Sequence, residues 1–68
     1  MVNKRKLMAL FALNNMKGYQ AAKQLDMSYN TLSNKMSGER DFKLSEIEQI
    51  KNMFNLSMDD IGEIFFDQ

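Results

Sequence analysis

The sequence contains no cysteine, no histidine, no proline and no tryptophan. Without cysteine the chain has no disulfide, no thiolate nucleophile and no zinc–thiolate site. Without histidine it has no His-based catalytic triad, no His-ligated metal and no charge switch near neutral pH. We therefore expect neither a metal nor a cofactor, and the composition favours a binding function over an enzyme.

Long apolar runs are also missing, since no stretch approaches the ~18 residues that a membrane-spanning helix needs. Residues 1–18 superficially resemble a signal peptide, but their apolar stretch is short and lacks a small-residue cleavage site. We interpret this stretch as a helix of the fold. With 68 residues, the chain is expected to form a single domain, residues 1–68, around a modest core.

The absence of proline, the three glycines and the scarcity of β-branched alternation predict an all-α fold. Apolar residues at helical spacing predict five helices. They cover roughly residues 3–15 and 19–25, a third segment between Ser28 and Gly38, a fourth from Leu44 or Ser45 to Asn55–Leu56, and a fifth capped by Ser57. Ser28 and Ser57 are good N-caps, and Gly38 is placed to end the third helix. Ser45 with Glu48 is expected to form a capping box at the start of the fourth helix.

The apolar faces of these helices define the expected core. The first helix should contribute Leu7, Leu10 and Phe11, widened by Met8, Ala12 and Leu13. The fourth and fifth helices should contribute Leu44, Ile47, Ile50, Phe54, Met58, Ile61, Ile64 and Phe65. Between the third and fourth helices, Phe42 is the one aromatic residue of a polar loop and is expected to plug the core.

The net charge is zero, but its distribution along the chain is uneven. Residues 1–40 carry seven basic and two acidic side chains, for a net charge of +5, and residues 41–68 carry two basic and seven acidic ones, for −5. Such asymmetry suggests that one face of the molecule meets a polyanion. The alternative is that the charges are scattered by chance or serve solubility.

The segment 18–38 carries the most information about function. It predicts two short helices joined by a tight turn, with the small Ala22 where they cross and Asp26 at a turn position that needs left-handed backbone geometry. The outer side of the second of these helices then presents short or planar polar groups, suited to base edges in the DNA major groove: Ser28, Tyr29, Asn30, Ser33 and Asn34. Basic side chains around it are suited to phosphate contacts: Lys17, Lys23, Lys35 and Arg40.

Each of these residues also has a simpler interpretation. Asn30 and Asn34 taken alone can merely solvate an exposed helix, Tyr29 can be a packed surface aromatic, and single lysines are usually just solvated. The combination of the small crossing residue, the turn, the capped polar helix, the glycine stop and the basic surround favours DNA binding.

The segment 21–38, AAKQLDMSYNTLSNKMSG, resembles the helix-turn-helix of phage Cro and repressor proteins. The similarity continues through residues 39–42, 44–47 and 56–61, and the end of the chain is similar to small Cro-like proteins of phages that infect Gram-positive bacteria. The resemblance implies a five-helix, lambda-repressor-like DNA-binding domain whose helix-turn-helix spans residues 18–38. It also implies a transcriptional regulator of the bacterial cytoplasm, acting as a dimer on a palindromic operator.

The resemblance places Ser28, Tyr29, Asn30, Ser33 and Asn34 at the family's base-contacting positions. Thr31 and Lys35 lie at the edge, where they are expected to contact phosphate. Three features depart from the family pattern. Gly18 stands where many members have a glutamine that touches phosphate, so that Tyr19 or Gln20 must replace this contact if it is made. The turn residue is Asp26 rather than glycine, and the net charge is zero where many relatives are basic.

A second hypothesis is a protein-interaction module, a modulator or antirepressor that binds a partner repressor instead of DNA. The neutral charge, the missing glutamine, the acidic C-terminal half and the seven methionines favour it. An enzyme is the weakest option, because the carboxylates Asp59, Asp60 and Glu63 are better interpreted as charges near a helix N-terminus. Phe65 and Phe66 are neighbours and cannot both face inward, so one of them is a candidate for a homodimer interface.

Overall fold

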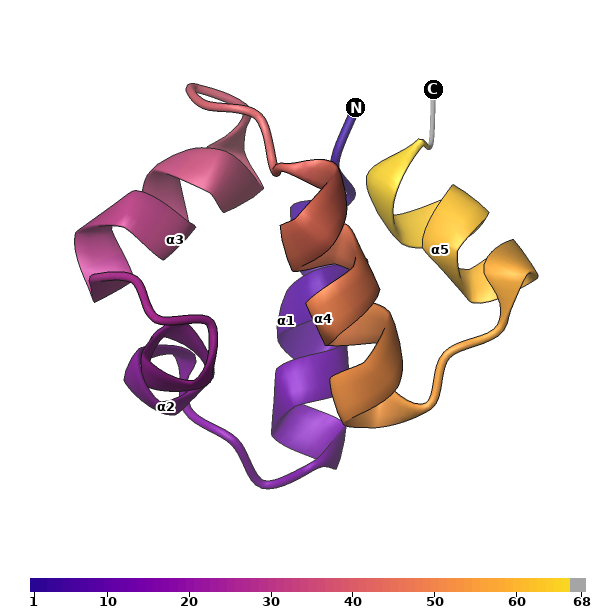
Figure 1. Cartoon of the computed structure of the whole chain (residues 1–68). Coiled ribbons are helices and arrows are strands. Elements are labelled where there is room, and N and C mark those ends of the chain that lie inside the picture. The colour runs from indigo at the N-terminus through magenta and orange to yellow at the C-terminus, as the bar shows by residue number, and fades with distance from the viewer. Residues whose placement is uncertain (67–68) are drawn as a thin grey trace.

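A computed structural model describes residues 1–66 of the chain, and within this range the protein is all-helical, with five helices and no strand (Figure 1). The helices are α1 (Lys4–Leu13), α2 (Gly18–Gln24), α3 (Tyr29–Ser37), α4 (Leu44–Phe54) and α5 (Met58–Phe65). In Figure 1, α1 and α4 lie in the middle, α2 and α3 lie on one side, and α5 lies on the other. The prediction of an all-α fold with five helices is thus confirmed.

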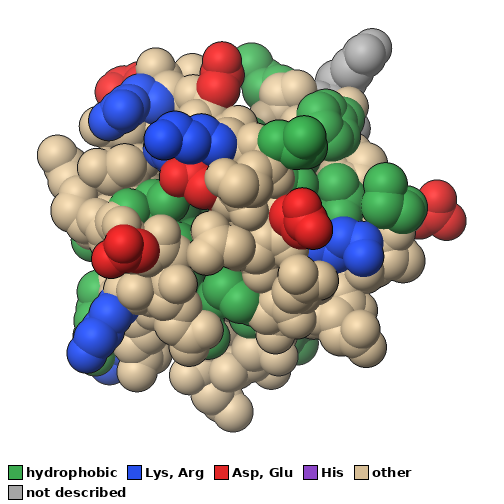
Figure 2. All heavy atoms as spheres, in the orientation of Figure 1, with side chains coloured by type: hydrophobic (Ala, Val, Ile, Leu, Met, Phe, Trp, Pro, Cys, Tyr) green, Lys and Arg blue, Asp and Glu red, His purple; other side chains and the backbone are tan. Residues whose placement is uncertain are grey.

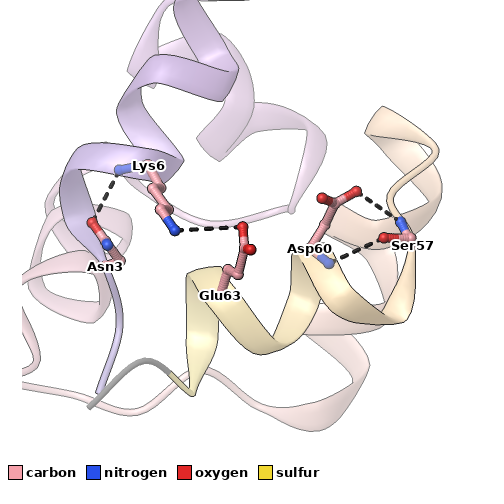
Figure 3. A network of polar contacts seen from close by, with 5 residues as sticks. All are labelled: Asn3, Lys6, Ser57, Asp60 and Glu63. Carbon is pink, nitrogen blue, oxygen red and sulfur yellow. Dashed lines mark hydrogen bonds and ion pairs between the residues drawn. The ribbon is translucent and has the colours of Figure 1, made fainter.

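Side-chain caps define the start of three helices. Asn3, Ser28 and Ser57 each accept a hydrogen bond from the backbone N–H three residues later, at 3.1 Å. At α5, Asp60 completes a capping box by accepting a hydrogen bond from the Ser57 N–H at 3.0 Å (Figure 3). This bond, together with the one involving the Ser57 side chain, holds the pKa of Asp60 below its ordinary value.

The capping box expected from Ser45 and Glu48 is wrong. Helix α4 begins at Leu44, with Lys43 as its N-cap residue, so that the third helical position is Glu46. The Glu46 carboxylate accepts a hydrogen bond from the Lys43 N–H at 2.8 Å. The error arises because a serine three residues before a glutamate does not by itself locate the first helical residue.

The predicted left-handed turn residue and the predicted glycine stop are both confirmed. Asp26 has φ of 57° in the turn after α2, and Gly38 has φ of 90° at the end of α3. Asp tolerates this conformation because its short polar side chain can bond locally. Both residues therefore end a helix and redirect the chain abruptly.

One core joins all five helices, with α1 near its centre. Its most deeply buried large side chains are Leu7, Leu32 and Ile50, from α1, α3 and α4. Aromatic contacts extend the core, since the rings of Phe11 and Phe54 lie 5.8 Å apart and those of Phe42 and Phe65 lie 5.3 Å apart in an edge-to-face arrangement. Phe42 packs against this core as predicted.

Five side chains expected in the core are exposed instead: Met8, Ala12, Leu13, Leu44 and Met58. On α1 the buried stripe follows Leu7 and Phe11, so the apolar face is narrower than the sequence pattern suggests, and Leu13 is 82% exposed. Leu44 and Met58 are the first residues of their helices and project beyond the packed faces. Within residues 1–66, none of the helices has both the length and the apolar character needed to span a membrane.

Candidate nucleic-acid interface

Helices α2 and α3 pack closely on each other across a short turn. The buried Ala21 and Ala22 let the two helices approach, Leu25 and Leu32 are buried in the core, and both helices contact α1. The turn is closed by backbone hydrogen bonds from Asp26 to Lys23 at 3.1 Å and from Met27 to Ala22 at 3.0 Å. These contacts hold α3 in a defined orientation on the rest of the fold.

The outward side of α3 is polar. Leu32 and Met36 are buried, whereas Asn30 is exposed and Ser33 and Asn34 are partly exposed. Asn30, Ser33 and Asn34 share one face of the helix, because residues three and four apart are neighbours on a helix surface. Amides and a hydroxyl on one helical stripe match the donors and acceptors at base edges.

The N-terminal end of this stripe is formed by Ser28 and Tyr29. Ser28 is exposed, but its hydroxyl accepts a hydrogen bond from the Thr31 N–H and donates one to Thr31 Oγ1 at 2.9 Å. The helix cap therefore already uses the two polar groups predicted to contact DNA at Ser28 and Thr31. Tyr29 is 52% exposed and lies beside Gly18, the first residue of α2.

Most of the residues predicted to contact phosphate are exposed, namely Lys17, Tyr19, Gln20, Lys23 and Arg40. The Gln20 side chain has a local role as well, because its Oε1 accepts a hydrogen bond from the Lys17 N–H at 2.8 Å. A shallow hollow beside the turn is lined by Tyr19, Lys23, Asp26, Met27 and Ser28. Lys23 is thus the predicted cation that adjoins the start of α3.

The structure corrects the prediction that Lys35 contacts phosphate. Its side chain is only 5% exposed, and Nζ forms an ion pair with the carboxylate of Glu46 on α4, whose side chain is 12% exposed. Burial raises the pKa of Glu46, but hydrogen bonds from Lys35 and from the Lys43 N–H, with the positive charges of both lysines, outweigh it and hold that pKa below its ordinary value. In this position Lys35 ties α3 to α4 and is not presented to a ligand.

The spacing within α3 contained the signal that Lys35 faces inward. Lys35 follows Leu32 by three residues and directly precedes Met36, so all three lie on the same side of the helix. The residue type led to the opposite prediction, because an unpaired lysine is rarely buried. Its partner, Glu46, belongs to another helix and could not be identified from this spacing.

The folded chain partly cancels the charge asymmetry of the sequence. In addition to the pair of Lys35 with Glu46, Lys6 on α1 lies 3.4 Å from Glu63 on α5 (Figure 3). Two of the seven basic residues of the N-terminal part are therefore paired with acidic residues of the C-terminal part. Asp67, counted in the acidic part, lies outside the described residues.

An apolar groove lies between α4 and α5. Ile47 and Ile61 line it, and its edges are formed by Leu44, Met58 and Phe66, which are 78%, 72% and 60% exposed. Figure 2 shows apolar side chains gathered over these two helices, at the upper right. Sequence reasoning missed this groove because it assigned Leu44 and Met58 to the core.

The two C-terminal phenylalanines face in different directions, as predicted. Phe65 is buried, with its ring against Phe42, and Phe66 is exposed. Phe65 is therefore excluded as a direct dimer contact and acts in the core instead. Only Phe66 of this pair is available to a partner.

Comparisons with protein-family models, with curated proteins and with solved structures found no match to this chain.

Proposed function

We propose that this chain is a sequence-specific DNA-binding transcriptional regulator of the Cro/repressor type, with a lambda-repressor-like fold. In this proposal α2, the turn at Asp26 and α3 form the helix-turn-helix, and α3 enters the major groove of operator DNA. The protein acts in the cytoplasm of a bacterial host and binds DNA without catalysing a reaction or requiring a cofactor.

The observation that carries the proposal is the two-sided character of α3. Its inner side is anchored by Leu32, Lys35 and Met36, all buried, and its outer side presents amide and hydroxyl groups. A helix held rigidly by its inner side can place its outer groups accurately against base edges, as helix-turn-helix proteins do. Tyr29, Asn30, Ser33 and Asn34 are the residues assigned to base contacts.

Phosphate contacts are assigned to the exposed cations Lys17, Lys23 and Arg40, with Tyr19 and Gln20 as polar neighbours. Each cation that neutralises a phosphate makes the slope of log K against log salt more negative by about 0.9. Three such contacts per chain correspond to a loss of affinity of about 40-fold between 50 and 200 mM salt.

Asn34→Ala and Lys23→Ala are expected to affect DNA binding in different ways. Asn34→Ala should reduce the preference for selected over scrambled duplexes by roughly 5- to 150-fold, since a bidentate amide–base pair contributes about 1–3 kcal/mol of discrimination. Lys23→Ala should weaken binding to both duplexes alike and make the slope of log K against log salt less steep by about 1. Fluorescence anisotropy at two salt concentrations, on duplexes selected from a random pool, measures both effects.

The DNA-binding proposal fails if the wild-type protein enriches no sequence from the random pool and shows no salt-dependent binding. In that case the interaction with a partner repressor becomes the better account. Equal losses for both variants on both duplexes would leave DNA binding intact but refute the division between base and phosphate contacts.

We also propose that two copies of the chain associate through the groove between α4 and α5. The rim of this groove carries Glu48 and Lys51, three residues apart on α4. In a two-fold contact the same patch meets itself, so Glu48 of one copy can face Lys51 of the other. Charges of opposite sign on one small apolar patch therefore suit a second copy of this chain.

The position of the groove also suits a palindromic operator. Helix α5 lies on the opposite side of the molecule from α3 (Figure 1), and the extents of the molecule are 26 × 25 × 21 Å. Copies joined at α5 have their α3 helices on the outer sides, farther apart than the two molecular centres. Successive half-sites on one face of DNA are ~34 Å apart, which is in the range this arrangement allows.

Phe66→Ser is expected to convert the dimer to a monomer, because it replaces an exposed aromatic residue at the edge of the groove with a polar one. Sedimentation equilibrium of the full chain measures the mass. Leu13→Ser is the matched control, since Leu13 is also an exposed apolar residue but lies in a separate hollow between α1 and α5. A wild-type monomer, or dissociation by Leu13→Ser instead of Phe66→Ser, would contradict the assigned interface.

A further inference from the structure

Gly18 and Tyr29 form a close contact between the first residues of α2 and α3. A methyl group added at Gly18 would lie 2.6 Å from Cε1 of the Tyr29 ring and 3.3 Å from Cδ1. Since carbon atoms at optimal contact are about 3.5–4.0 Å apart, the ring occupies the space that any side chain at position 18 would need. The absence of a side chain at Gly18 is thus what admits the ring.

Backbone geometry does not explain this glycine. Within residues 1–66, Gly38 has a positive φ and Gly18 does not. Within a helix, alanine is favoured over glycine by about 1 kcal/mol. Gly62, inside α5, differs in having nothing within 4 Å of an added methyl group. Of these two helical glycines, only Gly18 has a contact that a side chain would disrupt.

The Tyr29 ring lies against Gly18 without being buried. One part of the ring rests on Gly18, yet 52% of the residue stays exposed, at the N-terminal end of the polar stripe of α3. Residues at the N-terminal end of a recognition helix are those that contact base edges. An aromatic ring held there offers an apolar surface, which is the kind of group that recognises the methyl group of thymine.

We propose that Gly18 positions the ring of Tyr29 as a reader of a thymine methyl group in the DNA site. This inference rests on the proposed DNA-binding function and adds a base preference and the residue that enforces it. It also accounts for the departure from the family pattern at position 18. A glutamine at position 18 and a ring in this position exclude each other, so the chain exchanges a phosphate contact for a fixed aromatic side chain.

The test uses duplexes selected from a random pool by the wild-type chain, in which single thymines are replaced by deoxyuridine, which lacks only the methyl group. The wild type is expected to lose about 3- to 10-fold in affinity at one thymine per half-site. Tyr29→Phe should show the same loss, because the ring and not the hydroxyl makes the contact. Tyr29→Ala should bind the two duplexes equally.

Gly18→Ala is the decisive variant. The added methyl group must displace the exposed ring, so Gly18→Ala should also bind thymine and deoxyuridine duplexes equally while the chain stays folded by circular dichroism. Gly62→Ala is the matched control, since it makes the same change in a helix where the methyl group meets open space, and it should retain the wild-type loss.

The outcomes separate this inference from the proposal on which it rests. If the wild type selects no sequence at all, the DNA-binding function itself is wrong. If it selects a sequence but no thymine methyl group matters, or if Gly18→Ala keeps the wild-type methyl dependence, the positioning role of Gly18 is refuted while DNA binding stands. Methyl dependence lost in Tyr29→Phe would transfer the contact to the hydroxyl and overturn the proposed reading.

Discussion

Lys35→Ala is expected to lower the free energy of unfolding by about 3 to 5 kcal/mol, because it leaves the carboxylate of Glu46 largely buried without its partner. A domain of this size has a total stability of about 3 to 10 kcal/mol. The variant should therefore be largely unfolded or close to its unfolding transition at 25 °C. Urea denaturation followed by circular dichroism measures the change.

Companion variants show whether the loss comes from the unpaired charge. Lys35→Met keeps most of the side-chain volume and should still be destabilised, and the double variant Lys35→Met/Glu46→Leu should recover much of the loss, since neither charge remains. Lys6→Ala is the control, because its pair with Glu63 is about half exposed and should contribute less than 1 kcal/mol. A Lys35→Met variant as stable as the wild type would contradict the assigned role.

The same ion pair predicts how stability depends on acid. The pKa of Glu46 is lower in the folded chain than its ordinary value of 4.5, so the folded state favours the ionised carboxylate. Its contribution is fully present above pH 4.5 and is lost as the pH falls through the lowered folded value. Glu46→Gln should therefore be less stable at neutral pH and show a flatter loss of stability below pH 4.5. Some acid dependence should persist, because the pKa of Asp60 is also lowered.

Leu32→Ala is expected to lower the free energy of unfolding by about 2 to 5 kcal/mol. Leu32 is completely buried where α3 meets α2 and α1, so truncation leaves a cavity under the centre of α3. The variant should also lose specific DNA binding, because the polar stripe depends on this packing for its orientation. Thermal or urea unfolding measures the stability, and anisotropy measures binding at a temperature where the variant is still folded.

Leu13→Ala is the matched control for Leu32→Ala. The same atoms are removed, but Leu13 is 82% exposed, and exposed substitutions usually change stability by less than about 0.5 kcal/mol. A loss below 1 kcal/mol for Leu32→Ala would mean that α3 is not held by the core as described. If Leu13→Ala lost as much stability as Leu32→Ala, the Leu13 side chain on α1 would have to be buried in solution against a second molecule.

Features that depend on a few neighbouring residues were predictable. The caps at Ser28 and Ser57, the left-handed residue Asp26, the helix stop at Gly38 and the inward direction of Leu32 and Met36 all agree with the structure. Each rests on interactions within one helical turn, where residue type and spacing are sufficient. The capping box of α4 was predicted two residues too late. Two pairs of residues, Lys43 with Glu46 and Ser45 with Glu48, have the spacing of a capping box, and local spacing alone does not decide between them.

The candidate site was predictable only on its outer side. Asn30, Ser33 and Asn34 share a face by spacing alone, whereas Lys35 was assigned to the same surface because lysine is usually exposed. The exposed Leu44 and Met58 were assigned to the core for the converse reason. In each case the prediction used the usual burial of the residue type, because the sequence does not show which side chains of other helices lie next to it.

By itself, the amino-acid sequence determined that the chain is helical, approximately where its five helices lie and which stripe of α3 is polar, because those properties follow from periodicity and local hydrogen bonds. Only the tertiary structure decided that Lys35 pairs with Glu46, that the Tyr29 ring rests on Gly18, and that an apolar groove opens between α4 and α5. The physical reason is that each of these depends on contacts between different helices, and the distances between helices are set by packing of the whole core.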